Sequence, residues 1–375
     1  MERTGNSFVE IDLRKVRRNM DKIRLHVGPD VTVLPVLKAN ACGHGLVEMA
    51  RFLTVECGVA RLAVAQVREA RQLREAGITL DIMVLGGLPE DNIPYAVQED
   101  LITPLFRVEY ARTLSRFASG MGKSARVHIK IDTGLGRIGV RGENELTALL
   151  KEVGNLPSLQ VEGVFTHFSE AEIEDPSFTE EQIARFDAAV ARIRSSGFDL
   201  KYVHASNTPS TVRFAAARYN MVRTGLLWLG YDPCMDRPNR LDLETTLEWR
   251  AFITNINAVS AGTRLGYWRG FTAERDSKIA IGSFGYGDGY LEDLGKKGGC
   301  VLIRGRRAPL ISVCMDQTFI DVTDIDGVSV GDTITIIGHD GAEKIDALDL
   351  EQITHNSYVF YLCNINGRPV KTYLR

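Results

Sequence analysis

Short apolar segments rich in β-branched residues alternate with amphipathic segments through roughly the first 230 residues of the chain. Each apolar segment is bounded by polar or turn-forming residues, which is typical of strands buried on both faces of a sheet. The predicted strands span residues 32–37, 61–65, 81–86, 102–106, 127–132, 159–167, 201–206 and 221–227.

The amphipathic segments between these strands predict helices, most clearly over residues 66–76, 143–153 and 179–195. In the last of these, Ile183, Phe186 and Val190 recur with the period of an α-helix. Thr179 and Gln182, three residues apart, predict a capping box at its start.

Eight buried strands, each followed by a helix or helical turn, predict an α/β fold of the (β/α)8 TIM-barrel type. A doubly wound parallel sheet is the structural alternative, and the number of strands favours the barrel.

The pattern changes near residue 240, where short strands separated by turn residues follow one another with few helices before 347–362. This predicts a C-terminal, mostly-β domain. We place the barrel at residues 1–235 and the β domain at 236–375, with the boundary in the polar segment Asp232–Asp242. The first ten or so residues are a candidate partner of the β domain.

Composition places the chain among ordinary globular proteins: 44% of its 375 residues are hydrophobic and 25% are charged. A formal net charge of −3 argues against nucleic-acid binding. No apolar run reaches the ~18 residues that span a bilayer, and the N-terminal segment lacks the apolar core of a secretory signal. The six cysteines form no CxxC pair, so we expect reduced thiols, no zinc site and a cytoplasmic location.

Reactive side chains follow several of the predicted strands. In a (β/α)8 barrel the carboxyl ends of the strands meet at one mouth, where the active site lies. One lysine, two arginines and two histidines are therefore expected to converge there, together with nearby amide and hydroxyl groups. They are Lys38, Arg137, His167, His204, Asn207, Thr208 and Arg223.

The last two predicted strands also favour a phosphate site. Loops after strands seven and eight of such barrels bind phosphate through backbone N–H groups and hydroxyls. Thr208 and the amides of Gly225 and Leu226 fit that role. A lysine facing a phosphate site indicates pyridoxal phosphate held as a Schiff base, with Lys38 as the candidate.

Gly134, Gly136 and Gly139 match the G-x-G-x-x-G dinucleotide pattern. They follow the fifth strand rather than opening a mononucleotide-binding half, so we expect no nucleotide site there.

Seven sequence blocks, in order, make nearly the whole chain resemble the alanine racemases, a pyridoxal-phosphate-dependent family built from a barrel and a β domain. The blocks are LKANACGHG, HIKIDTGLGRIGV, VEGVFTHFSEAE, HASNTPST, YNMVRTGLLWLGYDP, FGYGDGY and VCMDQ. The resemblance implies a homodimer with shared active sites and a small amino-acid substrate.

The resemblance implies two catalytic bases on opposite faces of the cofactor, Lys38 and Tyr267, the tyrosine coming from the partner chain. It places Arg223 against the pyridine nitrogen, His204 behind Arg223, and His167 beside the catalytic tyrosine. An arginine is a poor proton donor, so the pyridine nitrogen is expected to stay unprotonated. A phenol needs a cationic or hydrogen-bonding neighbour to act as a base near neutrality.

Five further roles follow from the resemblance. Arg137 would hold the substrate carboxylate and the cofactor's phenolic oxygen, and Lys130 falls where many members carry a carbamylated lysine. Met315 of the partner chain would bind substrate, Tyr286 would line the entry path, and Tyr358 would contact the phosphate.

Three positions depart from the family pattern. Cys42 replaces a tyrosine that contacts the phosphate, and Trp268 follows the catalytic tyrosine where a small residue is usual. Near the C-terminus the sequence reads HNSYVFYLC, and we choose Tyr358 over Tyr361 as the phosphate ligand. These changes leave phosphate affinity and substrate choice open.

The function that the resemblance implies is interconversion of L- and D-alanine for cell-wall synthesis. A racemase of the same fold acting on serine or another amino acid is the alternative. A fold-related decarboxylase is disfavoured because such enzymes place a carboxylate where this chain has Arg223. A non-catalytic cofactor-binding protein is disfavoured because such homologues generally lack the β domain.

Overall fold

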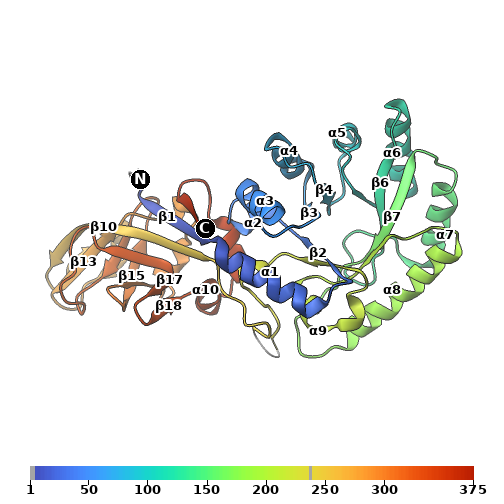
Figure 1. The fold of residues 1–375 in the computed structure, drawn as a ribbon. Coiled ribbons are helices and arrows are strands. Elements are labelled where there is room, and N and C mark those ends of the chain that lie inside the picture. Colours follow the sequence, from blue (N-terminus) through green and yellow to red (C-terminus); the bar gives the residue numbers. More distant parts are fainter. Residues whose placement is uncertain (1–4, 236–238) are drawn as a thin grey trace. The chain divides into compact units, whose positions relative to one another are not determined.

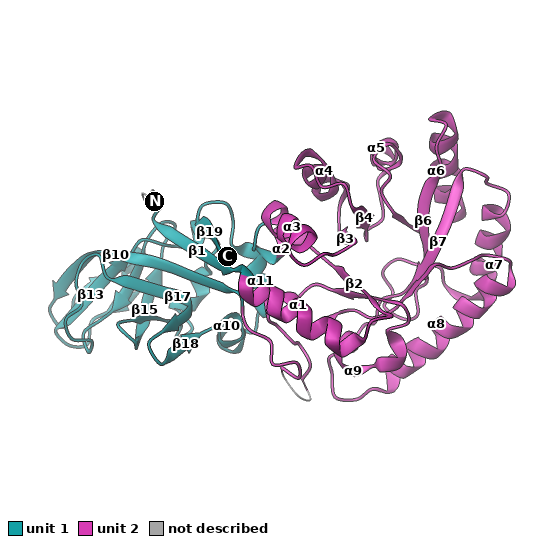
Figure 2. Cartoon of the chain, viewed as in Figure 1, with its two compact units in different colours: residues 1–13, 42–45, 246–375 teal, residues 14–41, 46–245 magenta. Residues whose placement is uncertain are grey.

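The structure is a computed structural model that describes residues 5–235 and 239–375. The chain folds into two compact units, coloured separately in Figure 2. Unit 1 contains the described residues up to Leu13, residues 42–45 and residues 246–375, and unit 2 contains 14–41 and 46–245. The chain therefore enters unit 1 three times.

Unit 2 is the predicted barrel of eight parallel strands. Paired strands and single bridges join neighbours in chain order from β2 to β8, and β9 pairs with β2. The ring closes where the Arg223 N–H donates to the Ser206 carbonyl oxygen at 3.0 Å. This circular order confirms the barrel and excludes a doubly wound sheet. The strands are β2 (Thr32–Pro35), β3 (Arg61–Val64), β4 (Asp81–Val84), β5 (Thr103–Leu105), β6 (Ala125–Lys130), β7 (Leu159–Phe165), β8 (Tyr202–His204) and β9 (Met221–Thr224).

Helices follow the strands, and the three predicted most clearly are present within two residues of their expected starts (Figure 1). The helices of the barrel part of the chain are α1 (Leu13–Val27), α3 (Leu46–Val55), α4 (Val67–Glu75), α5 (Ile93–Gln98), α6 (Val108–Gly120), α7 (Gly142–Val153), α8 (Ser177–Ser195) and α9 (Thr208–Arg213). The short segment labelled α2 (Lys38–Cys42) is left-handed at residues 39–41.

The capping box predicted at Thr179 and Gln182 is wrong. Helix α8 begins two residues earlier, at Ser177, so Thr179 and Gln182 both lie within the helix. Their side chains are fully buried. The Gln182 side-chain oxygen accepts hydrogen bonds from the backbone and hydroxyl of Ser169, in the loop after β7. A tertiary partner has therefore replaced the local one.

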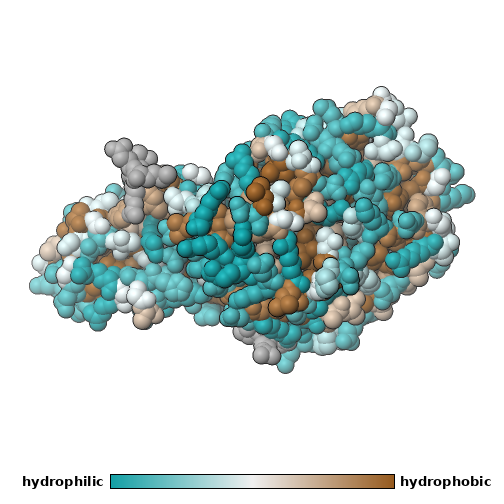
Figure 3. All heavy atoms as spheres, viewed as in Figure 1, coloured by the Kyte–Doolittle hydropathy of each residue, from teal (hydrophilic) through white to brown (hydrophobic). Residues whose placement is uncertain are grey.

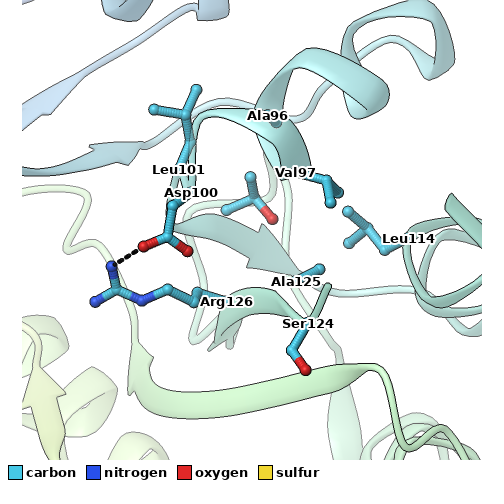
Figure 4. A pocket seen from close by; sticks show the side chains of 9 residues that line it. Ala96, Val97, Asp100, Leu101, Leu114, Ser124, Ala125 and Arg126 are labelled. Atoms are coloured by element: carbon cyan, nitrogen blue, oxygen red, sulfur yellow. Dashed lines mark hydrogen bonds and ion pairs between the residues drawn. The ribbon is translucent and has the colours of Figure 1, made fainter. Parts of the chain in front are cut away.

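A cluster of charged side chains lies at the amino ends of the barrel strands. Arg126 on β6 bonds to Asp81 on β4, to Glu162 on β7 and to Asp100, the last of these drawn in Figure 4. Arg61 on β3 also bonds to Asp81 at 2.9 Å. The hydrogen bond from Arg126 lowers the pKa of Asp81 below its usual range. This end of a barrel is associated with stability rather than catalysis.

We expect Asp81→Asn to lower the free energy of unfolding by about 2 kcal/mol at neutral pH, because two guanidinium groups lose a charged acceptor. Since the folded pKa lies below the unfolded value, the carboxylate stabilises the fold above the unfolded pKa, and this stabilisation is lost as the pH falls through the folded pKa. The difference in the free energy of unfolding between wild type and variant should therefore be largest at neutral pH and decrease below about pH 4. Denaturant unfolding at several pH values measures it, and a constant gap would contradict the assignment.

Unit 1 is built on a nine-stranded sheet in the order β18-β17-β14-β15-β16-β13-β10-β1-β19. The N-terminal strand β1 (Ser7–Asp12) lies inside this sheet, antiparallel to β10 and parallel to β19. The other strands are β10 (Leu247–Val259), β13 (Ser277–Gly282), β14 (Cys300–Ile303), β15 (Arg306–Val313), β16 (Thr318–Asp321), β17 (Thr333–Asp340), β18 (Glu343–Ile345) and β19 (Val370–Leu374), with the pair β11 (Arg264–Leu265) and β12 (Phe271–Thr272) and helices α10 (Ala347–Thr354) and α11 (Tyr358–Asn364).

The division between the units falls at Thr246, later than the expected boundary after residue 235. The reason lies in α1: the Asn19 side chain pairs with both backbone groups of Glu244, at 2.8 and 3.0 Å, and Arg18 forms an ion pair with the Glu244 carboxylate. These bonds keep the described residues up to Thr245 with the barrel. Residues 236–238 of the predicted boundary segment lie outside the described residues.

Hydrophilic and hydrophobic residues are interspersed on the face of the molecule drawn in Figure 3. Within the described ranges, no helix combines the length and apolar character needed to cross a membrane.

Candidate active site

Lys38 lies three residues after the end of β2 and is exposed at the carboxyl end of the barrel strands. The next residues form a left-handed turn, with φ of 55° at Ala39, 56° at Asn40 and 54° at Ala41. Each non-glycine residue in this conformation costs about 1–2 kcal/mol. The Asn40 side chain accepts the Leu46 N–H at 2.8 Å, and the Ala41 N–H donates to the Leu37 carbonyl oxygen. The lysine is thus presented by a backbone that tertiary bonds hold in an unfavourable shape.

Arg223 on β9 is 4% exposed and anchored by several hydrogen bonds. Its Nη1 donates to Nδ1 and the carbonyl oxygen of His204, both at 2.9 Å, and its Nη2 donates to the carbonyl oxygens of Thr166 and Ala205. Burial lowers the pKa of the guanidinium to about 9, which leaves it charged near neutral pH. The Nε–H is not engaged by any of these four acceptors.

Two buried histidines continue this network through the barrel interior. Because Arg223 can only donate, Nδ1 of His204 accepts and its Nε2 carries the proton. That Nε2 donates to Nδ1 of His128 at 2.8 Å, which puts the His128 proton on Nε2. Burial lowers the pKa of His128 to about 3 and that of His204 well below its usual value, so both rings are neutral.

His167 follows β7, and its Nδ1 lies 3.5 Å from Nη2 of Arg223. Burial, followed by the charge of Arg223, lowers the pKa of this histidine well below its usual value. The preceding Thr166 hydroxyl contacts the Thr133 hydroxyl at 2.8 Å, which also accepts from the Gln182 side chain. His167 is therefore a neutral ring beside a fixed cation.

Lys130 ends β6 and is 3% exposed, with its Nζ 4.3 Å from the centre of the Phe165 ring. Burial, followed by the charges of Arg223 and Arg137, lowers the pKa of its amine to about 7. No carboxylate in the described parts of the chain forms an ion pair with it. At neutral pH a large fraction of this amine is therefore unprotonated.

Arg137 is exposed in the loop after β6, and Asp132 shapes that loop. The Asp132 carboxylate accepts N–H bonds from Gly134 and Gly136 and pairs with Arg141. A Cβ at Gly139, whose φ is +144°, would lie 2.5 Å from the Asp132 nitrogen, so only glycine fits this close approach. The glycines thus serve a tight loop that presents Arg137.

The loops after β8 and β9 meet at Thr208. Its hydroxyl oxygen accepts the N–H groups of Gly225 at 3.2 Å and Leu226 at 3.4 Å. Asn207 caps α9, with its side chain accepting from the backbone and hydroxyl of Ser210. A hydroxyl and two amides therefore gather where the phosphate site was predicted.

The predicted partner-chain residues lie in unit 1. Tyr267 is 74% exposed and Trp268 97% exposed in a short turn where Trp268 has a φ of +59°. The loops that carry Tyr286 and Met315 are joined, because the Tyr286 N–H donates to the Cys314 carbonyl oxygen and the Gly287 N–H to that of Met315. Both side chains are exposed. These four exposed side chains are together called the aromatic set.

Tyr358 and Tyr361 both lie on α11 in unit 1 and both are buried. The Tyr361 hydroxyl contacts the Thr354 hydroxyl and the Leu350 carbonyl oxygen, so it is engaged by α10. The Cys42 side chain is buried, and its carbonyl oxygen lies 3.0 Å from Nδ1 of His44.

Within unit 2 the structure brings together Arg223, His204 and His167, and it brings Thr208 together with the amides of Gly225 and Leu226. Sequence reasoning identified all of these residues. It did not identify His128, Asp132 or Gln182, whose side chains support them. A polar residue at an inward position of a buried strand was the available signal for His128.

The chain matches two family models, one described as the N-terminal domain of alanine racemase over residues 11–233 and one as its C-terminal domain over residues 246–373. It is 38% identical over 371 residues to an alanine racemase of Halothermothrix orenii, covering 99% of this chain and 97% of the relative. It is 35% identical over 369 residues to one of Methanococcus maripaludis, covering 98% of both. A solved alanine racemase of Bacillus anthracis with bound L-Ala-P aligns with a TM-score of 0.93 at 32% identity, over 100% of this chain and 96% of that one.

Proposed function

The chain belongs to the alanine racemase family, and we propose that it interconverts L- and D-alanine with pyridoxal phosphate as cofactor, in the cytoplasm, supplying D-alanine for the cell wall. The observation that carries this proposal is the set of groups at the barrel mouth, where an exposed lysine follows one strand and a buried arginine stands on another. The relatives' names give the substrate.

The residues present fit pyridoxal phosphate. The Thr208 hydroxyl accepts from the Gly225 and Leu226 amides and keeps its own proton to donate to a phosphate. Both amides can turn from Thr208 to a bound phosphate, because their bonds to it are long, at 3.2 and 3.4 Å. The Nε–H of Arg223, which none of its four acceptors engages, is a donor that suits a ring nitrogen that accepts. Lys38 supplies the amine that would hold the cofactor covalently. When bound, the cofactor supplies the electron sink that weakens the Cα–H bond of an amino acid.

The arginine network determines what Arg223 can do. Its terminal nitrogens are fixed by carbonyl oxygens and by the neutral His204, so the side chain stays charged and directed. It can donate a hydrogen bond through Nε without giving up a proton. The ring nitrogen of a bound cofactor would therefore stay unprotonated, and the cofactor would be a weaker electron sink. This would favour return of the proton to Cα over side reactions such as transamination.

Racemisation needs a proton taken from one face of Cα and another returned to the opposite face. We assign these steps to the amine of Lys38 and the phenol of Tyr267 from the partner chain, with His167 assisting the phenol. Arg137 would hold the substrate carboxylate, with Met315 of the partner chain beside it and Tyr286 lining the entry. The exposure of the aromatic set supports a homodimer, because aromatic side chains and Met are enriched at interfaces.

Tyr358 is our candidate for the phosphate contact from α11, since the Tyr361 hydroxyl is already engaged by α10. Asn207 remains a candidate cofactor-binding residue, because it caps α9, the helix that begins with Thr208.

We further propose that Lys130 is carbamylated. The neutral amine attacks CO2: an N–C bond forms, one C=O π bond becomes a carboxylate C–O⁻, and one proton is released. A neutral buried amine thus becomes an anion within the electrostatic influence of Arg223 and Arg137. Because the pKa of this amine is about 7, the fraction able to react rises as the pH rises through that value. With ¹³C-labelled bicarbonate, we expect a carbamate resonance that grows with pH and is missing in Lys130→Ala. An identical resonance in that variant would contradict the assignment.

The direct test of the function is the purified protein with pyridoxal phosphate and a panel of L-amino acids, with racemisation followed by chiral chromatography. We expect alanine to give the highest kcat/KM. Serine or another amino acid exceeding alanine tenfold would establish the alternative racemase, and release of CO2 would indicate a decarboxylase.

A further inference from the structure

Glu69, in the first turn of α4, joins the carboxyl ends of two barrel strands. Its Oε1 accepts the Ala39 N–H at 2.7 Å, in the peptide that follows Lys38 beyond the end of β2. Its Oε2 accepts the N–H groups of Ala65 and Gln66, at 2.8 and 3.1 Å, directly after β3. One carboxylate therefore holds the peptide that follows Lys38 against the neighbouring strand end.

The bond to Ala39 is not part of ordinary helix capping. A glutamate at this position of a helix commonly accepts the N–H of the capping residue, here Gln66. Ala39 belongs to a different segment, thirty residues earlier in the chain. The second carboxylate oxygen thus serves the segment that carries Lys38.

That segment needs such a bond because its backbone is left-handed. Ala39 is the first residue of the turn, and L-residues leave this region readily when nothing holds them. Asn40 and Ala41 secure the later part of the turn through Leu46 and Leu37. At the lysine end, the hydrogen bond from the Ala39 N–H to Glu69 is the corresponding restraint.

We propose that Glu69 is a positioning residue for the racemisation reaction: by holding the Ala39 peptide it fixes the direction in which the Lys38 side chain leaves the barrel wall. The inference rests on the proposed function, in which Lys38 is the cofactor-bearing base. Loss of the bond would leave substrate binding nearly intact and misplace the amine relative to Cα, and small misplacements of a reacting group lower kcat strongly.

Two variants separate this role from helix capping. Glu69→Gln keeps the size but replaces one accepting oxygen by a donor. Glu69→Asp keeps the charge and is a good acceptor near a helix start, but it is one methylene too short to reach both strand ends. Glu75→Gln is the matched control, because Glu75 is an exposed glutamate at the other end of the same helix.

The first measurement is hydrogen exchange in the apoprotein, over a peptide covering residues 38–42. We expect exchange to accelerate on the order of 10-fold in both Glu69 variants and to stay unchanged in Glu75→Gln, since the lost bond protects one amide of that peptide. The second is steady-state racemisation by the loaded enzyme. We expect kcat to fall on the order of 10²-fold in Glu69→Gln, with KM changed less than about threefold.

A purely capping role predicts a lower melting temperature with unchanged kcat and unchanged exchange in residues 38–42, and that result would overturn the proposal. If Glu69→Gln fails to fold, Glu69→Asp decides: wild-type kcat in that variant refutes the positioning role. If the wild-type enzyme racemises no amino acid, the proposed function fails instead.

Discussion

Replacing Lys38 by alanine is expected to abolish racemisation, with kcat lowered by more than about 10³-fold, because the variant loses both a proton-transfer base and the covalent attachment of the cofactor. Lys38 is exposed at the end of β2, whereas the other lysine at the barrel mouth, Lys130, is buried. The visible absorption band of lysine-bound pyridoxal phosphate should disappear with the activity.

The controls for this experiment lie in the same unit. Lys151→Ala removes an exposed lysine from the last turn of α7, which precedes the amino end of β7, and should leave both the absorption band and the activity unchanged. Lys130→Ala should keep the band. A band that persists in Lys38→Ala and disappears in Lys130→Ala would show that the wrong lysine was assigned.

Replacing Tyr267 by phenylalanine should lower racemisation by on the order of 10³-fold and retain the cofactor band. The change removes one hydroxyl from a residue that is 74% exposed, so the stability of the chain should hardly change. In D2O, we expect exchange of the α-proton to continue from one enantiomer and to be lost from the other, because only one face of Cα loses its base. NMR of L- and D-alanine measures both, with Tyr95→Phe as control. Undiminished exchange from both enantiomers would contradict the two-base assignment.

The same two variants test whether active sites are shared. Neither Lys38→Ala nor Tyr267→Phe should be active alone. If Tyr267 serves the partner's site, a mixed dimer contains one site with both defects and one intact site, so random mixing should restore about a quarter of wild-type activity. No recovery after subunit exchange would show that Tyr267 does not act across a dimer.

The barrel could be predicted from the sequence because its strands are buried on both faces and so appear as uninterrupted apolar runs, such as residues 81–86 for β4 (Asp81–Val84). Thr208 and Arg223 could be placed by topology alone, because all parallel strands end at one mouth. Local sequence patterns were therefore enough to predict the strands, which burial determines, and the site residues whose position follows from strand direction.

Side chains that bond across the fold could not be predicted in this way. Gln182 follows Thr179 at capping-box spacing, yet its partners Ser169 and Thr133 lie on other loops. Glu69 looks like an ordinary residue of a helical first turn, and only the structure connects it to Ala39. His128 is a single polar residue in a buried strand, and only the structure shows that its ring accepts a hydrogen bond from His204.

The placement of β1 has a consequence for biosynthesis. Ser7–Asp12 are translated before both of their strand partners, β10 and β19, which come from beyond residue 246. The barrel can assemble while the chain is still growing, whereas the sheet of unit 1 must wait until β19 has been translated. Until then the first strand is an unpaired apolar edge that chaperones or neighbouring nascent chains can bind. Slow completion of this sheet, rather than of the barrel, should therefore limit the yield of native enzyme.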